Sequence, residues 1–445
     1  MVATQDDLAQ VPAGSFARPH PARRYGLVAA VAGTALLLLG YLADLAAHPA
    51  LLNWFDLDVY VQAGRTAAHD PANLYVMVLN YRKFTYTPFA ALLFSAVRWV
   101  PWLVLTRLVT VASVLALAVV AWLTFGALDW RGARRAGGTL LLAGLAVWLE
   151  PVQRALQLGQ LEVPLLLLLV WDLCQPDHRR FKGAGIGLAA GIKLVPLIFI
   201  PYLLLAGRVR QSVVAAATFA VTAAIGWIFL PGTFGSYWLS GYFMQPSDIG
   251  PVGAFRNQSV MGMFIRITGH IQTAQPWWIA ASVLIGVAGL GAAAVLHRSG
   301  RPVHGWLTCA IAGLLISPVS WDHHWVWIVP LFAVIADCAI RASYSARQAW
   351  WTTGAALVLL FGAYPAALHG PDAWVPVGGL LGLVNNRPGL GGVHYHHPSV
   401  MVSWDLFVLT GLAILAVMII GAWRVRRDVP PLAVAPKRAG RTLAS

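Results

Sequence analysis

The sequence predicts an all-α polytopic membrane protein, a bundle of about twelve membrane-embedded helices with loops on its outer face. Three observations predict this fold class. Hydrophobic residues make up 58% of the 445 positions and the mean hydropathy is +0.68, so the apolar runs exceed what a soluble core of this length requires. The alternating ten-residue segments of a membrane β-barrel are absent from the sequence. Basic residues gather in short clusters between the apolar runs, as they do in cytoplasmic loops.

The net charge of +14 would suggest a nucleic-acid partner if the protein were soluble. Here the lysines and arginines fall in short loops, where they set topology and meet anionic lipid. We therefore expect membrane lipid, and no nucleic acid, as a partner. The three cysteines, Cys174, Cys309 and Cys338, are scattered through apolar segments without metal-ligand spacing. This pattern predicts neither a disulfide framework nor a cysteine metal site.

The chain divides into a cytoplasmic tail of residues 1–25, one membrane domain of residues 26–423 and a second cytoplasmic tail of residues 424–445. Residues 26–46 are predicted to form an uncleaved first span, because many further apolar runs follow. Residues 87–100 are apolar but short, so this stretch either crosses the membrane or lies along its surface. The other predicted spans are residues 102–128, 137–149, 161–174, 212–230, 279–297, 305–320, 326–340, 349–368 and 401–423, with long outer loops at 47–86, 231–276 and 369–400.

One apolar stretch, residues 183–206, is interrupted by glycines and by Pro196 and contains Lys193. Basic residues stand at both of its ends, at Lys182 and Arg208, which places both ends in the cytoplasm. We predict a broken or re-entrant pair of half-helices here, because one ordinary span would reverse the direction of every later segment.

With that pair in place, the ionisable residues outside the basic clusters gather on the outer side of the membrane. An enzyme there has poor access to cytoplasmic nucleotides, so its activated substrate should be carried by a lipid. The residues assigned to the outer face are Asp56, Asp58, Glu150, Asn257, Asp322, His323, His324, His394, His396 and His397.

Asp56 and Asp58 follow the first span in a chain of which only 11% of residues are charged. Exposed loops often carry acids, but ionisable groups this scarce usually serve chemistry, transport or pairing in a membrane protein. We interpret Asp58 as a general base that removes a proton from a hydroxyl acceptor. Two residues of separation point the carboxylates in different directions on a strand or a helix, so Asp56 stays an alternative.

The segment Ser317–Trp325 lies at a turn between two predicted spans and contains Trp321, Asp322, His323 and His324. Histidines at an interface are often polar anchors. A metal requires three or more ligands, and adjacent side chains usually diverge. We predict no metal here, and instead a role in holding a substrate phosphate or in sharing the acceptor proton.

Lys193 either snorkels to the inner surface or pairs with a lipid phosphate or an acid. Asn257, Gln258 and Ser259 formally match a glycosylation acceptor, but in an enzyme they suit hydrogen bonds to a sugar or a phosphate. The tract His394–His397 is typical of metal binding or of a flexible lid. The other polar residues predicted to bind the substrates are Arg65, Arg82, Lys83, Tyr86, Glu150, Arg154 and Gln160.

Six short motifs are spread along most of the chain. They are Asp58, Phe84–Phe89, Gly159–Gln160, Gly191–Pro196, Asn257–Ser259 and Ser317–His324. Together they resemble glycosyltransferase family 87, actinobacterial mannosyltransferases of the membrane-embedded GT-C class, and the resemblance covers about residues 26–423. The sequence departs from the pattern at Glu162, where many relatives carry an amide or a small residue, and this bears on the role of that site.

The resemblance implies polyprenyl-phosphate-mannose as the donor, a mannose hydroxyl of a glycolipid as the acceptor, and inversion at the anomeric carbon. The chain is similar to the α-1,2-mannosyltransferases that extend phosphatidylinositol mannosides, and also to those that branch lipomannan. The essential aspartate of the family maps onto Asp58, and its histidine maps onto His323 or His324. A single displacement needs no cofactor or divalent metal, because cationic side chains can stabilise the departing phosphate. We expect a monomer in the plasma membrane with its active site facing outward.

Two other functions fit parts of the sequence. A transporter or lipid flippase would suit the broken helix and Lys193, but it predicts polar residues across the full membrane depth and internal repeats. The sequence shows neither feature. A transferase of another polyprenyl-linked sugar, such as arabinofuranose, would share the architecture, because sugar identity depends on the shape of the pocket.

Overall fold

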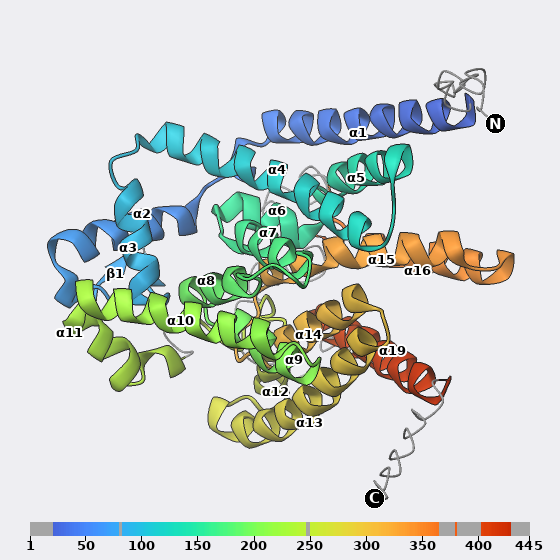
Figure 1. The fold of residues 1–445 in the computed structure, drawn as a ribbon. Helices are drawn as coiled ribbons and strands as arrows, with labels where there is room; N and C mark the ends of the chain where they lie inside the picture. Colours follow the sequence, from blue (N-terminus) through green and yellow to red (C-terminus); the bar gives the residue numbers. More distant parts are fainter. Residues whose placement is uncertain (1–20, 80–81, 246–249, 365–378, 381–401, 429–445) are drawn as a thin grey trace, which may run out of the picture.

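The computed structural model is a bundle of helices, and it describes residues 21–79, 82–245, 250–364, 379–380 and 402–428. Helix α1 (Pro21–Ala47) lies along the top of the view in Figure 1 and α13 (Ile271–Arg298) along the bottom. A single two-stranded sheet occurs among the described residues. The prediction of an all-α fold is confirmed.

The N-terminal half of the chain supplies the helices that surround α2 and the interrupted stretch. In chain order they are η1 (Pro49–Leu51), α2 (Phe55–His69), η2 (Pro71–Asn73), the strands β1 (Val78–Leu79) and β2 (Arg82–Lys83), α3 (Pro88–Val97), α4 (Trp102–Ala127), α5 (Gly132–Ala146), α6 (Glu150–Leu158), α7 (Glu162–Leu173), α8 (Ala184–Ile192), η3 (Val195–Ile198), α9 (Phe199–Leu205) and α10 (Val209–Phe229).

The C-terminal half completes the bundle. After α10 come α11 (Pro231–Phe234), η4 (Gly235–Leu239), η5 (Tyr242–Met244), α12 (Val260–Thr268), α13, α14 (Pro302–Ile316), η7 (Asp322–Trp327), α15 (Ile328–Arg341), α16 (Tyr344–Phe361) and α19 (Leu406–Asp428).

Six helices of the described part of the chain are long and apolar enough to cross a membrane, and the bent pair α6–α7 would make a seventh. The chain is therefore a multi-pass membrane protein, but the structure does not show twelve spans. A crossing needs about 20 apolar residues, whereas α5 and α14 have 15 residues each and α7 has 12. The six candidate spans are Gly26–Ala47, Trp102–Ala127, Val209–Phe229, Ile271–Arg298, Asp322–Arg341 and Leu406–Arg427.

The interrupted stretch 183–206 forms two half-helices, α8 and α9. Helix α8 ends where Lys193 takes an extended conformation. The two ends of the stretch meet at Asp177, whose carboxylate pairs with Lys182 Nζ at 2.9 Å and with Arg208 Nη1 at 2.7 Å. These ends therefore lie side by side, as a re-entrant pair requires.

Three glycines spaced four residues apart let α8 lie directly against α10. A Cβ atom added at Gly183, Gly187 or Gly191 would lie within 2.3 Å of an atom of α10. Small residues at this spacing are typical of close helix packing in membranes. Because Gly191 faces Thr222 of α10, the tip of α8 reaches past the midpoint of α10 and holds Lys193 there.

The polar stretch between the predicted spans 137–149 and 161–174 is the buried helix α6 and not an open loop. Its axis makes an angle of 118° with that of α7. Gly159 ends α6 with a φ of +67°, a conformation that favours glycine. A Cβ atom at Gly159 would also lie 2.8 Å from Leu57 Cβ, so the glycine lets α2 pack against the bend.

Two hydrophobic clusters build the interior. The larger one joins α4–α7 to α14 and α15, and the smaller one joins α2 and α3 to Tyr75, Phe84 and Tyr237. Leu161 and Ile192 contact both clusters. Their polar neighbours in the sequence therefore lie where the two clusters meet.

Some predicted features lie outside the described residues. His394, His396 and His397 belong to this group, as do most of the predicted loop 369–400 and most of the two predicted tails.

Candidate active site

Helix α2 forms one wall of the candidate site and carries Asp56 and Asp58 in its first turn. The predicted divergence of these two carboxylates is confirmed, because they bond to different partners. Gln160 Nε2 donates to Asp56 Oδ2, whereas Gln62 Nε2 donates to Asp58 Oδ2 from one turn further along α2. Asp58 Oδ1 has no hydrogen-bond partner among the described residues, and the side chain is half-buried.

Gln160 connects α2 to the bend between α6 and α7. Its Oε1 accepts from Tyr60 Oη at 2.5 Å and from Tyr86 Oη at 3.3 Å, and the two phenols lie 2.8 Å apart. Burial raises the pKa of Tyr60 well above its usual value and raises the pKa of Tyr86 to about 12. Both hydroxyls therefore keep their protons at neutral pH and act as donors.

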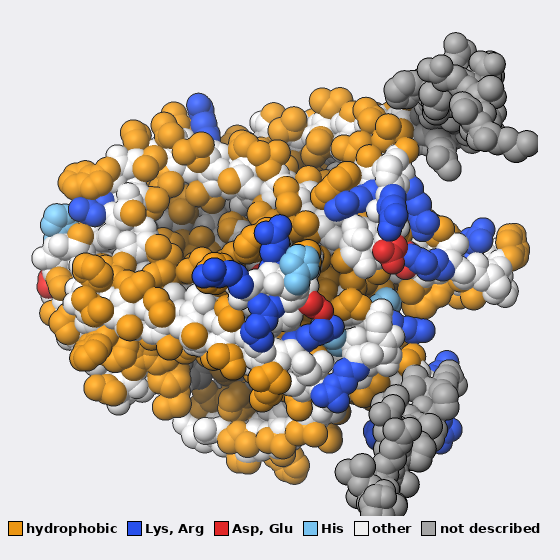
Figure 2. All heavy atoms as spheres, viewed as in Figure 1, with side chains coloured by type: hydrophobic (Ala, Val, Ile, Leu, Met, Phe, Trp, Pro, Cys, Tyr) orange, Lys and Arg blue, Asp and Glu red, His pale blue; other side chains and the backbone are white. Residues whose placement is uncertain are grey.

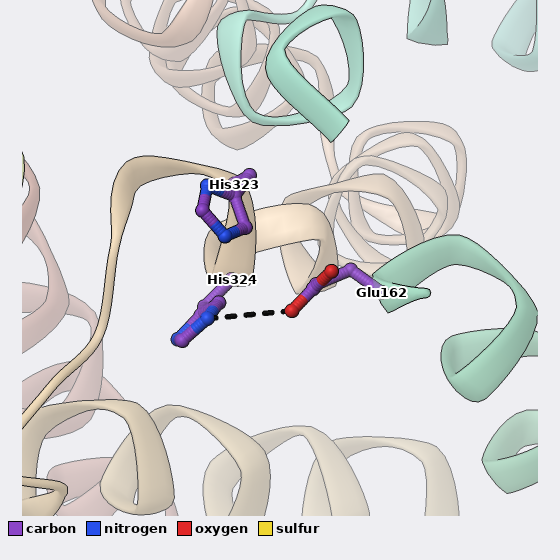
Figure 3. A group of neighbouring side chains, drawn as sticks. All are labelled: Glu162, His323 and His324. Carbon is purple, nitrogen blue, oxygen red and sulfur yellow. Dashed lines mark ion pairs between the residues drawn. The ribbon is translucent and has the colours of Figure 1, made fainter. Parts of the chain in front are cut away.

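Lys193 at the tip of α8 contacts both Glu162 and His324, and these two residues also pair with each other (Figure 3). Its ammonium donates to Glu162 Oε1 and lies 2.9 Å from His324 Nε2, which is itself 3.3 Å from Glu162 Oε1. The ring of Tyr86 lies 5.4 Å from the same ammonium. The sequence predicted that Lys193 either snorkels to the inner surface or pairs with a lipid phosphate or an acid. The structure shows that it pairs with the acid Glu162.

Glu162, His323 and His324 each offer a ligand atom within 4.8 Å of the others, a grouping that could hold a metal ion. Lys193 bears on this interpretation. Its ammonium already bonds to Glu162 and lies beside His324, so a divalent ion would have to displace it. The positive charge at this point is supplied by the protein itself.

A second wall of the candidate site is the start of η7, where Asp322 lies 1% exposed. Arg256 Nη1 donates to Asp322 Oδ2, and Arg154 Nε lies 4.0 Å from the same oxygen. His323 bonds to Asp322 Oδ1 through its backbone nitrogen at 2.9 Å, and its ring Nδ1 lies 3.2 Å from that oxygen. Glu150 Oε1 is 3.7 Å from Arg256, so two acids and two arginines balance each other in a buried place.

Several buried polar atoms of this wall have no hydrogen-bond partner among the described residues. They are both carboxylate oxygens of Glu150, both amide atoms of Gln153, Arg154 Nε, Glu162 Oε2 of the neighbouring Lys193 cluster and His323 Nε2. Most buried polar groups in folded proteins are paired. These atoms are therefore available to a ligand rich in hydroxyl or phosphate oxygens.

Asn257, Gln258 and Ser259 are fully buried and bond to the backbone. The Asn257 amide nitrogen donates to the backbone carbonyls of Val252 and Pro318, and its Oδ1 accepts from the backbone nitrogen of Ser320. Gln258 bonds to the backbone around residues 404–408, and Ser259 caps α12. These side chains hold the loop before α12 against η7, and their polar atoms are not directed at the Asp58 wall.

The other predicted binding residues have varied positions. Arg65 is exposed on α2, Lys83 is half-buried in β2, and Trp321 is half-buried with its backbone paired to Asn257. The side chain of Arg82 lies outside what the structure describes. Among the described contacts, the side chains of Arg65 and Trp321 do not join the charge network around Asp322.

Arg256, Gln62 and Gln153 were not predicted from the sequence. An arginine in a predicted outer loop departs from the usual bias toward the cytoplasm, and that departure was a signal for Arg256. Gln62 stands four residues after Asp58, which is helical spacing, but the segment was not predicted as a helix. Gln153 is a neutral amide beside the charged Arg154 in the polar stretch 150–160, and its residue type alone gave no comparable signal.

Comparison with known proteins identifies the class of enzyme. The model described as "Glycosyltransferase family 87" matches residues 84–318, which is more than half of the chain. The protein is thus a glycosyltransferase. It belongs to glycosyltransferase family 87.

Three relatives show how far the similarity extends. The polyprenol-phosphate-mannose-dependent alpha-(1-2)-phosphatidylinositol pentamannoside mannosyltransferase of Mycobacterium tuberculosis (strain CDC 1551 / Oshkosh) is 31% identical over 67% of this chain and 70% of its own. The protein of the same description from Mycolicibacterium smegmatis is 31% identical over 76% of this chain and 83% of its own. The corresponding phosphatidylinositol mannoside mannosyltransferase of Mycobacterium tuberculosis (strain ATCC 25618 / H37Rv) is 31% identical over 63% of this chain and 69% of its own. No solved structure matches the chain.

Proposed function

We propose that this protein transfers mannose from polyprenol-phosphate-mannose to a mannose 2-hydroxyl of a phosphatidylinositol mannoside, forming an α-1,2 linkage. The observation that carries the proposal is the 31% identity, over 63–76% of the chain, to three proteins described by that donor, linkage and acceptor. The relatives differ in their description of the acceptor, which leaves its number of mannose units to experiment.

The site faces the outer side of the plasma membrane in this proposal. Lysine and arginine side chains are concentrated from the centre to the right of the face in Figure 2, whereas its left part is mostly apolar. Arg131, Arg179, Arg210 and Arg298 are exposed. Basic ends of membrane proteins remain in the cytoplasm. Helix α8 enters from that basic end and carries Lys193 toward the other side.

Cysteine labelling tests this orientation. In a background without Cys174, Cys309 and Cys338, we expect Arg179→Cys and Arg210→Cys to react with an impermeant maleimide only after the membrane is opened. A residue of the opposite end, Ala72→Cys, should react in intact cells. Labelling of Arg179→Cys without Arg210→Cys would break the re-entrant pair.

Asp58 acts as the general base. Its open Oδ1 takes the proton of the acceptor 2-hydroxyl as that oxygen attacks the anomeric carbon of the donor mannose. The new bond forms as the bond to the phosphate oxygen breaks, and the bonding electrons leave with the phosphate. One in-line displacement inverts the anomeric carbon, and the proton ends on Asp58.

The ammonium of Lys193, which lies beside His324 of η7, receives the leaving phosphate. Lys193 provides a fixed positive charge, and His324 lies 2.9 Å from it. Glu162 holds the ammonium in place. The departing monophosphate is stable as an anion and needs no proton donor, and fixed charges in a dry site stabilise the developing charge more than water does.

The Asp322 wall orients His323 for the substrates. Asp322 fixes Nδ1 of the ring and leaves Nε2 free to bond to a substrate oxygen. Arg256 and Arg154 balance the acid, and Gln153 adds an amide that has both atoms free. Asp56 belongs to the wall formed by α2, where it positions Gln160 and the two phenols.

The test is transfer in membranes from a host that lacks this activity. Wild-type protein receives labelled polyprenol-phosphate-mannose and phosphatidylinositol mannosides of increasing length, and the product is treated with an α-1,2-specific mannosidase. We expect a labelled glycolipid that loses its label to the mannosidase, and none with GDP-mannose as donor or with Asp58→Asn. Transfer from GDP-mannose in donor-depleted membranes would contradict the proposal.

A further inference from the structure

A groove on the basic end of the bundle suits a ligand that the transfer reaction does not use. It has a volume of about 1280 Å³ and runs between the pair α1 and α5 and the pair α15 and α16, which lie at the upper right of Figure 1. Its walls are formed by apolar and small side chains, including Leu141 and Leu145 of α5, Phe332 of α15 and Val358 of α16.

The charge of the groove is concentrated at its mouth. Among the described residues that line it, Arg131 and Arg134 are charged and none is acidic. Arg131 is exposed and has no ion pair among the described residues. Arg134 stacks on Trp130 at 4.1 Å and lies 3.8 Å from Asp337. The carboxylate of Asp337 is already bonded to Arg341 and Trp130, so Arg134 keeps capacity for another anion.

Beyond Leu145 and Val358, the last lining residues of α5 and α16, the backbone joins these two helices. Leu149 and Gly362 pair there, and the backbone nitrogen of Ala363 donates to the carbonyl of Trp148. This pairing joins the end of α5 to the end of α16 and separates the groove from Glu150. An occupant therefore enters from the basic end or from the side, and its polar group lies at the arginines.

The length of the groove fits one leaflet. Arg134 and Leu145 are 11 residues apart on α5, which is about 16 Å at 1.5 Å per residue and roughly half of the ~30 Å hydrocarbon core. An acyl chain of a phospholipid covers this depth. A polyprenyl chain attached to a phosphate at the outer site would have to pass the paired backbone of Leu149 and Gly362.

We propose that this groove binds an anionic phospholipid of the cytoplasmic leaflet, with its phosphate on Arg131 and Arg134 and an acyl chain between α5 and α16. Each basic residue near a membrane surface favours anionic lipid. The occupant holds the pair α1 and α5 against the pair α15 and α16. This inference does not depend on the identity of the transferred sugar.

The test is native mass spectrometry of the delipidated protein titrated with phosphatidylglycerol, or with phosphatidylcholine of the same chains. We expect one tightly retained phosphatidylglycerol and about thirtyfold weaker retention of phosphatidylcholine. Arg131→Gln with Arg134→Gln should abolish this preference, and Arg131→Lys with Arg134→Lys should keep it. Ala355→Trp, which fills the groove from an exposed position, should weaken both lipids.

The matched control is Arg298→Gln, which removes an exposed arginine of the same end outside the groove and should leave retention unchanged. Three results would overturn the proposal: equal retention of the two lipids, an equal loss in Arg298→Gln, or displacement of phosphatidylglycerol by equimolar polyprenyl phosphate. The double variant Arg131→Lys with Arg134→Lys controls for misfolding, because it changes the same two positions but keeps their charge.

Discussion

Asp58 and Asp322 are the same residue type in two parts of the candidate site, α2 and η7, yet their surroundings differ. Asp58 receives one hydrogen bond, from the neutral amide of Gln62, and keeps an open oxygen. Asp322 is almost fully buried and is engaged by Arg256 and His323. A carboxylate with an open oxygen can accept a proton, whereas one surrounded by cations holds them in place. Both acids stand out in the sequence because charged residues are rare in this chain. Their different roles follow only from how each side chain is packed.

The largest expected effect is on the open carboxylate. Asp58→Asn keeps the side-chain shape but removes the base, so we expect kcat to fall about 10²–10⁴-fold. Its unfolding free energy should change by less than about 0.5 kcal/mol, because no ion pair is lost. Transfer assays and thermal unfolding in detergent measure the two quantities.

Asp56→Asn is the matched variant for Asp58, since it alters the neighbouring acid of the same helical turn. It disturbs Gln160 and should cost about tenfold in kcat, the effect of a small misplacement in the site. If Asp56→Asn is as inactive as Asp58→Asn at normal stability, the assignment of the base moves to Asp56 or to the pair.

Asp322, which is buried among cations, should differ from Asp58, because its loss should lower stability as well as activity. Asp322→Ala leaves Arg256 and Arg154 near each other without their shared acid, and breaking a buried ion pair costs about 3–5 kcal/mol. We expect a large fall in thermal stability together with the loss of transfer. Wild-type stability in this variant would mean that solvent reaches the network, and the contrast between the two walls would fail.

The cluster around Lys193 gives a smaller effect. Lys193→Gln removes a charge that stabilises the leaving phosphate, so it should lower kcat/KM for the polyprenyl donor about tenfold and leave the KM for the acceptor nearly unchanged. Glu162→Gln tests whether the acid only holds the lysine. In a double-mutant cycle the pair should show a coupling of about 1–3 kcal/mol, and purely additive losses would place Glu162 on the substrate instead.

The sequence predicted what depends on composition and periodicity. The apolar runs predicted an all-helical membrane protein. The basic residues Lys182 and Arg208 predicted that both ends of the stretch 183–206 lie on the same side of the membrane. The count of twelve embedded helices is not shown, because short apolar runs such as α7 bend and pair instead of crossing alone. Helix α6 escaped prediction because its polar residues looked like a loop, although they face the interior.

The candidate site shows the same limit. Asp322, His323, His324 and Lys193 were identified from their types and positions, since charges are rare in this chain. The partnership of Lys193 with Glu162 joins residues 31 positions apart, and that of Asp322 with Arg256 joins residues 66 apart. Contacts at such separations are fixed by helix packing, which a local pattern does not contain.

The smallest effect concerns Tyr86, which connects the two walls. Its hydroxyl bonds to Gln160 near α2, while its ring lies against Lys193. Tyr86→Phe removes one hydrogen bond worth about 0.5–1.5 kcal/mol, so we expect kcat/KM to fall about 3–10-fold.

Burial raises the pKa of Tyr86 from 10.0 to about 12, and the hydroxyl stays protonated between about pH 6 and pH 9. The ratio of wild-type to variant activity should therefore be constant over that range. Because the folded state holds this proton more tightly than the unfolded state, the wild type should lose stability as the pH rises from about 10 to 12, and Tyr86→Phe should lose less. A ratio that changes near neutral pH would show that the phenol ionises in the reaction, which its burial argues against.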